Sequence, residues 1–398
     1  MKVGVFSVID WSFLDQRPQV LAKKLSQWGH DVVYFEPFFK FQQWNDTFSH
    51  PWSEYETACW KLRNVFPRVN AVTMMCPPAH RSLGAIVDKN IEYKDRNKAY
   101  VKTLKLDLAI VIDPAWGALL DELKIPYIYD HVDDTQHMGH VLKEYWVKAQ
   151  NNCTQNAIAI MYIQPNISRR HNGLYVPNGI EPSQLEINAT PKKYFDSGCL
   201  SAIADWFDLE SVLSSKKKLL IIGPMDLSVR AEYEKYRQLG ETNVTWIPRV
   251  SRRNGVHWLK RCKTAMVPFR DDHAIVDYVM PLKLVEYLYL GLPSISYLNK
   301  GIEEEFGEVV QFYSCFNWRG LPSLDEAIEL ALAKPENSLA YKQLAEKFTW
   351  DRVCRPLEQL VNKLDQSRSF NAPFRNISRD FVSASSITPL SKEVSSGT

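Results

Sequence analysis

A repeated alternation of short apolar runs with helix-length segments most constrains the fold of this 398-residue chain. Residues 2–9 form an apolar run rich in β-branched side chains. Residues 17–29 follow with apolar positions at helical spacing and a terminal glycine, and residues 32–35 form a second apolar run. This order predicts a βαβ unit, and therefore a parallel sheet with helices on its faces.

The same rhythm continues and falls into two series. Further strands of the first series are expected at 108–112, 127–129, 157–163 and 174–176. Strands of the second series are expected at 198–203, 219–222, 244–247, 264–267 and 294–297. Two tandem α/β domains of Rossmann-like type are therefore predicted.

The polar stretch 181–197 contains two prolines and interrupts the strand rhythm, so it is the expected linker. We expect an N-terminal domain at 1–185 and a C-terminal domain at 186–345. A closing helix that packs back toward the N-terminal domain is expected at 346–366. The tail, 367–398, is rich in Ser, Thr and Asn and is expected to lack stable structure.

Composition excludes several classes of protein. The 48 basic and 46 acidic residues give a net charge of +2, which argues against a nucleic-acid partner bound by bulk charge. The 7 cysteines are scattered without a Cys-x-x-Cys pair, so neither a disulfide framework nor a zinc finger is expected. No leader or membrane-spanning run is evident, which predicts a cytoplasmic protein, with association at the inner face of the membrane as a further possibility.

Several motifs that commonly bind phosphate groups or metal ions are absent from the sequence. The 16 glycines include no Gly-x-Gly pair, so the dinucleotide fingerprint and the phosphate loop are absent. No Asp-x-Asp motif is present to hold a divalent ion beneath a nucleotide diphosphate, and the spacing of His131, His137 and His140 matches no standard ligand set. We therefore expect no cofactor and no metal.

The most informative segment is 281–293, whose pattern predicts a short helix. Pro281 is expected at its first helical position, and Gly291 with Pro293 at its end. The unpaired N–H groups at the helix start favour an anion, and Lys283 adds a full charge there. Glu286 lies on the same face one turn later, where a carboxylate can accept the hydroxyl groups of a ribose. The alternative interpretation is an exposed Lys–Glu pair on an ordinary amphipathic helix.

A family resemblance rests on this helix together with segments elsewhere in the chain. The segments are Pro281-x-Lys283-x-x-Glu286-Tyr287-Leu288-x-x-Gly291-x-Pro293, Val176 to Ile180, Asp10-Trp11, Gln16 to Gln19, Tyr34 to Pro37, Tyr129 to Asp134 and Ala202 to Asp208. Over residues 2–360 the chain resembles the GT-B glycosyltransferases, in particular family 4. Within that family it is similar to a branch of teichuronic-acid and exopolysaccharide transferases, and more distantly to the xanthan glucuronosyltransferase.

The resemblance implies a GT-B architecture of two Rossmann-like domains with a cleft between them and C-terminal closing helices. It implies that the second domain holds a nucleotide-sugar donor, with Lys283 on the diphosphate and Glu286 on the ribose. Arg270 and, more weakly, Arg249 follow strands of that domain and are further candidate cations, each with a solvated loop charge as the alternative. Ser201 stands in the expected phosphate pocket, where relatives often have Gly.

One position departs from the family pattern. Many family 4 members carry a Glu eight positions before the ribose-binding Glu, and here that position is Tyr278, with Asp277 beside it. The resemblance therefore leaves the stereochemical outcome open, retaining or inverting.

The first domain is expected to hold the acceptor in loops at the carboxyl ends of its strands. Asp133 or Asp134 is the predicted catalytic base or hydroxyl-orienting group. Asp130 and Asp10 are the alternatives for that role. Predicted acceptor-binding residues are Arg17, Trp11 and Gln19.

A nearby aromatic cluster is open to two interpretations. Its members are Phe35, Phe38, Phe39, Phe41 and Trp44. They pack as core or form a lip that faces a membrane or a sugar.

Together these features predict a metal-independent glycosyltransferase. It would move a sugar from a nucleotide-diphosphate sugar to a glycan or lipid-linked acceptor in surface-polysaccharide synthesis. Two other functions remain open: a non-catalytic nucleotide-sugar-binding subunit, and a sugar-nucleotide epimerase of the same fold.

Overall fold

The computed structural model describes most of the chain and divides it into two compact units. The described residues are 1–12, 15–37, 59–74, 84–132, 143–187, 191–240, 242–316, 318–334, 337–367, 374–384 and 389–392. Unit 1 comprises Met1–Ile163, Ser168–Val176 and Cys354–Ile387, and unit 2 comprises Gln164–Ile167, Pro177–Val353 and Thr388–Thr398. The two units interleave along the chain. The domain boundaries expected at 185 and 345 stay a prediction.

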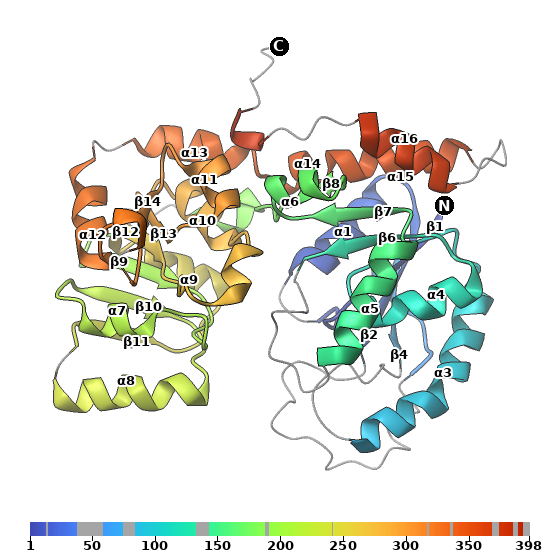
Figure 1. Ribbon diagram of the computed structural model, residues 1–398, viewed down its shortest axis with the longest axis horizontal. Coiled ribbons are helices and arrows are strands. Elements are labelled where there is room, and N and C mark those ends of the chain that lie inside the picture. Colours follow the sequence, from blue (N-terminus) through green and yellow to red (C-terminus); the bar gives the residue numbers. More distant parts are fainter. Residues whose placement is uncertain are drawn as a thin grey trace. The chain divides into compact units, whose positions relative to one another are not determined.

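Unit 1 is built on an eight-stranded sheet with the order β3-β4-β2-β1-β5-β6-β7-β8 (Figure 1). Its strands are β1 (Lys2–Phe6), β2 (Asp31–Pro37), β3 (Arg63–Phe66), β4 (Val69–Met74), β5 (Leu108–Val111), β6 (Tyr127–His131), β7 (Ala159–Tyr162) and β8 (Leu174–Tyr175). All neighbours pair in parallel except β3 and β4, which are antiparallel. The first crossover helix, α1 (Arg17–Gln27), begins with a capping box in which Gln16 and Gln19 bind each other's backbone N–H groups.

The other helices of unit 1 cross between strands or follow the sheet. They are α3 (Gly84–Leu104), α4 (Gly117–Leu123), α5 (Lys143–Asn156), α15 (Arg355–Ser367) and α16 (Phe374–Ala384). Helix α6 (Pro165–Arg170) lies where the chain passes from unit 2 back to unit 1.

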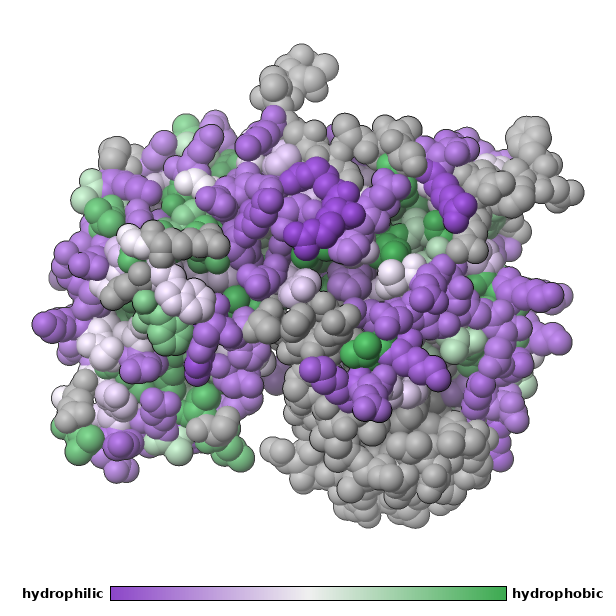
Figure 2. All heavy atoms as spheres, viewed as in Figure 1, coloured by the Kyte–Doolittle hydropathy of each residue, from purple (hydrophilic) through white to green (hydrophobic). Residues whose placement is uncertain are grey.

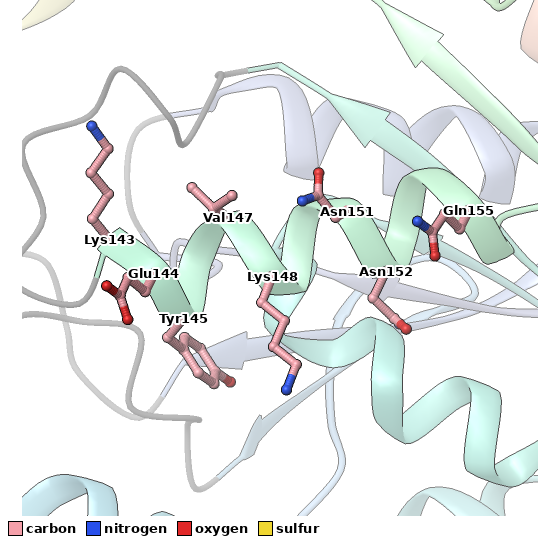
Figure 3. Close-up of a pocket in the computed structure, with 8 residues that line it drawn as sticks. All are labelled: Lys143, Glu144, Tyr145, Val147, Lys148, Asn151, Asn152 and Gln155. Atoms are coloured by element: carbon pink, nitrogen blue, oxygen red, sulfur yellow. The ribbon is translucent and has the colours of Figure 1, made fainter.

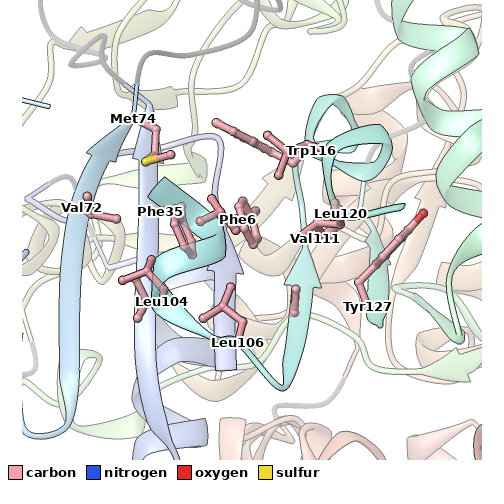
Figure 4. Packing of buried hydrophobic residues seen from close by; sticks show 14 of the residues in the cluster. Phe6, Phe35, Val72, Met74, Leu104, Leu106, Val111, Trp116, Leu120 and Tyr127 are labelled. Atoms are coloured by element: carbon pink, nitrogen blue, oxygen red, sulfur yellow. The ribbon is translucent and has the colours of Figure 1, made fainter. Parts of the chain in front are cut away.

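The core of unit 1 is aromatic at its centre (Figure 4). Phe6 of β1 and Phe35 of β2 stack with ring centroids 4.1 Å apart, and Trp116 lies 5.4 Å from Phe6. Leu104 and Leu106, at the end of α3 and in the loop before β5, close the cluster from one side. Burying such large rings supplies much of the hydrophobic stabilisation of this sheet.

Unit 2 is built on a six-stranded parallel sheet with the order β11-β10-β9-β12-β13-β14. Its strands are β9 (Phe195–Leu200), β10 (Leu219–Ile222), β11 (Val244–Ile247), β12 (Cys262–Val267), β13 (Ser294–Tyr297) and β14 (Gln311–Tyr313). Its helices are α7 (Leu209–Ser214), α8 (Leu227–Leu239), α9 (Arg252–Leu259), α10 (Leu282–Tyr289), α11 (Lys300–Phe306), α12 (Leu324–Ala333), α13 (Ser338–Glu346) and α14 (Trp350–Val353). In Figure 1, α8 lies beside the β11 edge of this sheet.

Each sheet has one point where the strand order reverses. In unit 1 the chain runs from β1 to β2 on one side and later to β5 on the other. In unit 2 it runs from β9 to β10 and β11, and then returns to β12 on the opposite side of β9. Ligands of open α/β sheets bind outside the carboxyl ends of the strands at such a point. The loops after β1 and β5, and those after β9 and β12, are therefore the places where a site is expected.

The predicted α/β organisation with two parallel-sheet domains is confirmed, although three strands escaped prediction. These are β3, β4 and β14. The tail also differs from expectation, because Phe374–Ala384 form α16. Ser378 of this helix is fully buried, and its hydroxyl donates to the Ile158 carbonyl oxygen at 2.7 Å. Within the aromatic cluster of the first domain, Phe35 is a core residue, and the other members lie outside the described residues.

No helix in the described part of the chain combines the length and apolar character that crossing a membrane requires. On the face drawn in Figure 2, the hydrophobic areas of the described residues are scattered among hydrophilic ones.

Gly223 follows β10 and illustrates how closely the loops at the carboxyl ends approach one another. Its φ is +143°, and a Cβ atom placed there would lie 2.0 Å from the Ser201 carbonyl oxygen. We predict that Gly223→Ala lowers the free energy of unfolding by at least the roughly 1–3 kcal/mol typical of backbone strain. Gly240→Ala is the matched control, since its φ is +69° but no atom lies within 4 Å of the added Cβ. Equal losses of thermal stability in the two variants would contradict the prediction.

Candidate functional site

Helix α10 starts at the carboxyl edge of the unit 2 sheet. Leu282 is its first residue, and Pro281 is the N-cap in an extended conformation, so the expectation that Pro281 occupies the first helical position was wrong by one residue. The proline has no side-chain donor or acceptor with which to cap the helix. The Leu284 N–H donates to the Pro281 carbonyl oxygen at 3.0 Å, and no described side chain caps the N–H groups before it, which leaves them open to an anion. Gly291 ends the segment with φ +73°, as its sequence predicts.

A buried tyrosine fixes α10 against the sheet. The Tyr287 hydroxyl accepts a hydrogen bond from the Leu200 backbone N–H, the last of β9, at 2.8 Å. Tyr287 is fully buried, and burial raises its pKa well above the usual value, so the hydroxyl stays protonated. Lys283 lies one turn before Tyr287, which places it on the face of α10 that points toward the end of β9.

The structure brings Lys283 and Glu286 together and adds a third residue, Arg252. The Glu286 carboxylate is 2% exposed. Its Oε2 accepts from Lys283 Nζ at 3.1 Å, and its Oε1 accepts from Arg252 Nη2. The two cations come from different helices, α10 and α9, so the cluster does not depend on helical spacing alone.

Arg252 is the residue that sequence reasoning missed. It begins α9, 34 positions before its carboxylate partner. Its side chain is 28% exposed, yet its Nε lies buried without a hydrogen-bond partner among the described residues. A buried guanidinium donor without a partner is costly, and an anionic ligand would satisfy it. The only sequence signal was a pair of arginines after a strand, which is common in ordinary loops.

The loop that precedes α10 is held by Asn299, the N-cap of α11. Asn299 Nδ2 donates to the carbonyl oxygens of Val276 and Val279 at 2.8 and 2.9 Å. Its Oδ1 accepts from the Ile302 N–H at 2.7 Å. Tyr278 lies between the two bound carbonyl groups, at the position where the resemblance to family 4 leads one to expect Glu in many members. These hydrogen bonds hold the backbone on both sides of Tyr278.

The other predicted donor residues are placed around the same edge. Ser201 directly follows β9, and its N–H donates to the Ile222 carbonyl oxygen at 3.0 Å. Arg270 follows β12, but its guanidinium forms a two-point ion pair with Asp272, with donor to acceptor distances of 3.0 and 2.7 Å. Arg249 is exposed in the loop between β11 and α9. Arg252 contacts Glu286, whereas the Arg270 guanidinium pairs with Asp272.

In unit 1, the predicted residues Arg17 and Asp130 bind each other. Arg17 Nε and Nη2 donate to the two carboxylate oxygens of Asp130, each at 2.7 Å. The side chains are 6% and 0% exposed. Burial works to lower the pKa of Arg17, and the Asp130 carboxylate raises it by more. Their predicted roles in acceptor binding and catalysis stay predictions.

Asp10, Trp11 and Gln19 shape the loop after β1. The Asp10 carboxylate accepts from the Ser12 N–H at 2.9 Å. Gln19 is fully buried, and its amide donates to the Asp10 carbonyl oxygen at 3.0 Å. The Trp11 backbone N–H donates to a Glu36 carboxylate oxygen at 2.9 Å, and the Trp11 ring meets that of Tyr34 edge to face at 5.1 Å. These contacts hold residues 10–12 at the strand-order reversal. Asp133 and Asp134 lie outside the described residues.

Asp113 is a buried carboxyl at the same reversal point that the sequence did not single out. It follows β5, and its N–H donates to the carbonyl oxygen of Phe6 at the end of β1, at 3.2 Å. Its Oδ1 accepts from the Ala115 N–H at 3.0 Å, and its Oδ2 has no partner among the described residues. Burial raises the pKa of Asp113 to about 7.

A separate hollow of about 1080 Å³ lies along α5, with the lining side chains of that helix drawn in Figure 3. None of the predicted site residues is among its described lining, which includes Lys143, Tyr145 and Lys148. Among the described residues, no three His, Cys, Asp or Glu side chains gather as a metal site would require. Metal independence stays a prediction.

Comparison with known proteins identifies the architecture. No protein-family model matches the chain, and no curated protein sequence matches it. The solved structure of sucrose-phosphate synthase from Thermosynechococcus elongatus aligns with a TM-score of 0.68 at 14% identity, over 92% of this chain and 99% of that one. A trehalose-6-phosphate protein from E. coli bound with UDP-2-fluoro glucose aligns with a TM-score of 0.61 at 11% identity, over 99% of this chain and 100% of that one.

A third structure, Anabaena HepE in complex with UDP and glucose, aligns with a TM-score of 0.60 at 11% identity, over 91% of this chain and 99% of that one. These structural neighbours are GT-B glycosyltransferases. At such identities the likeness shows the fold alone. The chain therefore has the GT-B fold, and its similarity to the family 4 branch stays a prediction.

The contribution of the buried Arg17–Asp130 pair to the free energy of unfolding can be tested directly. We predict that Arg17→Met alone lowers the free energy of unfolding by about 3–5 kcal/mol, because it leaves an uncompensated buried carboxylate. The double variant Arg17→Met with Asp130→Leu should recover most of that loss. Chemical denaturation checks both values. A loss within about 0.5 kcal/mol for the single variant, as expected of a solvated side chain, would contradict the buried pairing.

Asp113 predicts a pH dependence of stability. A carboxyl whose pKa is about 7 in the folded chain and near its usual value of about 3.9 when unfolded binds more protons in the folded state between those two pH values. Its contribution to stability is therefore lost as the pH rises from about 4 to about 7. We predict that the melting temperature falls more between pH 5 and pH 8 for the wild type than for Asp113→Asn, which keeps the acceptor for Ala115. Parallel pH profiles would contradict this assignment.

Proposed function

We propose that the chain is a glycosyltransferase that takes its sugar from a nucleotide-diphosphate donor bound at the start of α10. The observation that carries the proposal is the cluster of Lys283, Glu286 and Arg252 beside the open N-terminus of α10. Two ligand-bearing structures of the same fold support it, since one is a complex with UDP and glucose and another is bound with UDP-2-fluoro glucose.

The chemistry asked of this cluster is stabilisation of the departing diphosphate. The Lys283 ammonium, the Arg252 guanidinium and the first N–H groups of α10 would meet the charge that develops on the leaving group. Glu286 would accept the ribose hydroxyl groups through the lone pairs that its two cation contacts leave open. Because the positive charge comes from side chains and backbone, no metal ion would be needed.

The acceptor in this proposal is a glycan or a lipid-linked sugar of a surface polysaccharide, and the reaction takes place in the cytoplasm or at the inner face of the membrane. Unit 1 would bind the acceptor through the loops that follow β1 and β6. Asp133 or Asp134 would orient or deprotonate its hydroxyl group, with Asp10 as the alternative. Asp130 is the weakest of these candidates, because its carboxylate is already bound at two points by Arg17.

Donor binding is the first measurement. We predict that the chain binds UDP or another nucleoside diphosphate in the presence of EDTA. Lys283→Ala and Arg252→Ala should each weaken that binding at least tenfold, which corresponds to about 1.4 kcal/mol, because each removes one cation. Lys235→Ala, an exposed lysine on α8, is the matched control and should leave the affinity unchanged. Binding that requires a divalent ion would refute the proposed site.

Turnover separates the transferase from its two rivals. Donor consumption should depend on an added cell-envelope acceptor, with release of the nucleoside diphosphate. A donor that binds but is never consumed across a broad acceptor panel would identify a binding subunit, for which the Tyr278 position is the motivating observation. A donor whose sugar changes configuration with no acceptor present would identify an epimerase.

A further inference from the structure

Another pocket lies in unit 2, at the ends of α9 and α10 that are opposite the donor cluster. Its volume is about 500 Å³. The pocket lies where α9 and α10 end and α13 begins, and its lining includes Lys260, Tyr289, Gly291, Leu339 and Lys342. This size lies within the range of about 300–1,000 Å³ that is typical of small-molecule sites.

The charged residues of the pocket's described lining are two lysines and one glutamate. Lys260 and Lys342 are both half-buried, and neither forms an ion pair with any described residue. Lys260 Nζ donates to the Ile187 carbonyl oxygen at 2.9 Å, and Lys342 Nζ lies 4.9 Å from the centre of the Tyr289 ring. Burial lowers the pKa of Lys260, and repulsion by Lys342 lowers it further, so the ammonium groups lie within electrostatic reach of each other.

One carboxylate faces the same pocket. Glu186 is exposed at the rim, and its Oε1 accepts from the Tyr289 hydroxyl at 3.4 Å. It offsets part of the positive charge but pairs with neither lysine. Burial raises the pKa of the Tyr289 hydroxyl, and the exposed carboxylates of Glu346 and Glu181, outside the described lining, also act on that hydroxyl and raise its pKa. The remaining lining is neutral or apolar, and Leu339 is 68% exposed. A ligand with one anionic end and one less polar end would match these surfaces.

We propose that this pocket binds a phosphorylated small molecule, with its phosphate between the ammonium groups of Lys260 and Lys342. A phosphate monoester carries a charge of about −1.5 to −2 at pH 7, which matches two cations better than a single carboxylate does. Lysine binds phosphate as a compact point charge with three rotatable donors, so both side chains can reach one phosphate group. The rest of the ligand lies against Leu339 and the edge of Tyr289.

The probes are inorganic phosphate and glucose 6-phosphate, each titrated calorimetrically into the full chain. The Lys283→Ala background weakens the contribution of the proposed donor site to the signal. We expect Lys260→Gln and Lys342→Gln each to weaken binding at least fivefold. We expect Glu186→Gln to tighten it at least twofold, because that variant removes the carboxylate of the pocket's described lining. Lys235→Gln serves as the control for loss of a lysine elsewhere.

Each outcome decides the proposal. Binding of glucose 6-phosphate but not of inorganic phosphate, lost in both lysine variants, supports a site for a sugar phosphate. Binding of both probes with the same pattern supports a site for phosphate itself. Absence of binding in the Lys283→Ala background, or binding that both lysine variants retain, overturns it.

The double variant Lys260→Gln with Lys342→Gln should retain its affinity for UDP. That outcome shows that a loss of phosphate binding does not arise at the donor site. Its melting temperature, compared with that of Lys235→Gln, shows that a loss of phosphate binding does not come from unfolding.

Discussion

Parallel pairing of neighbouring strands is the constraint on which the candidate site depends. A parallel ladder cannot be closed by a tight turn, so each strand is followed by a crossover and all loops after the strands collect at one edge. In unit 2, β9 pairs with both β10 and β12, which places the loops that follow all three strands side by side. The Tyr287 hydroxyl then binds the last N–H of β9, and this hydrogen bond fixes the start of α10 at that edge.

Sequence reasoning recovered the buried strands because their signal is local. Runs such as Leu219–Ile222 are apolar throughout, as expected for strands covered on both faces. Strands β3 and β4 escaped because β3 is exposed and polar at its start and because Arg68, not glycine, supplies the left-handed residue of the connecting turn, with φ +59°. Strand β14 has only three residues, too few for any pattern to be read. Helix α16 escaped as well, although Phe374, Ile377 and Phe381 recur at helical spacing in its sequence.

The same distinction between local and distant signals applies to the site. Lys283 and Glu286 could be paired from the sequence because three residues on a helix place them on one face. The contact of Arg252 with Glu286 depends on how α9 and α10 cross the sheet, which no local pattern encodes. Arg270 satisfied the same sequence criterion as Arg252, yet Asp272, two residues further along, takes up its guanidinium. Tertiary geometry therefore decides which arginine serves the cluster.

Helices α9 and α10 carry charged or polar residues at both of their ends. Each has eight residues and is about 12 Å long, because an α-helix rises about 1.5 Å per residue. At their starts stand Arg252 and Lys283, and at their ends stand Lys260 and Tyr289. A helix is a stiff element. A charged ligand at the starts of α9 and α10 and a charged ligand at their ends would therefore act on the same two rigid helices. Any free energy of coupling between the two ends must then be reciprocal, whichever ligand binds first.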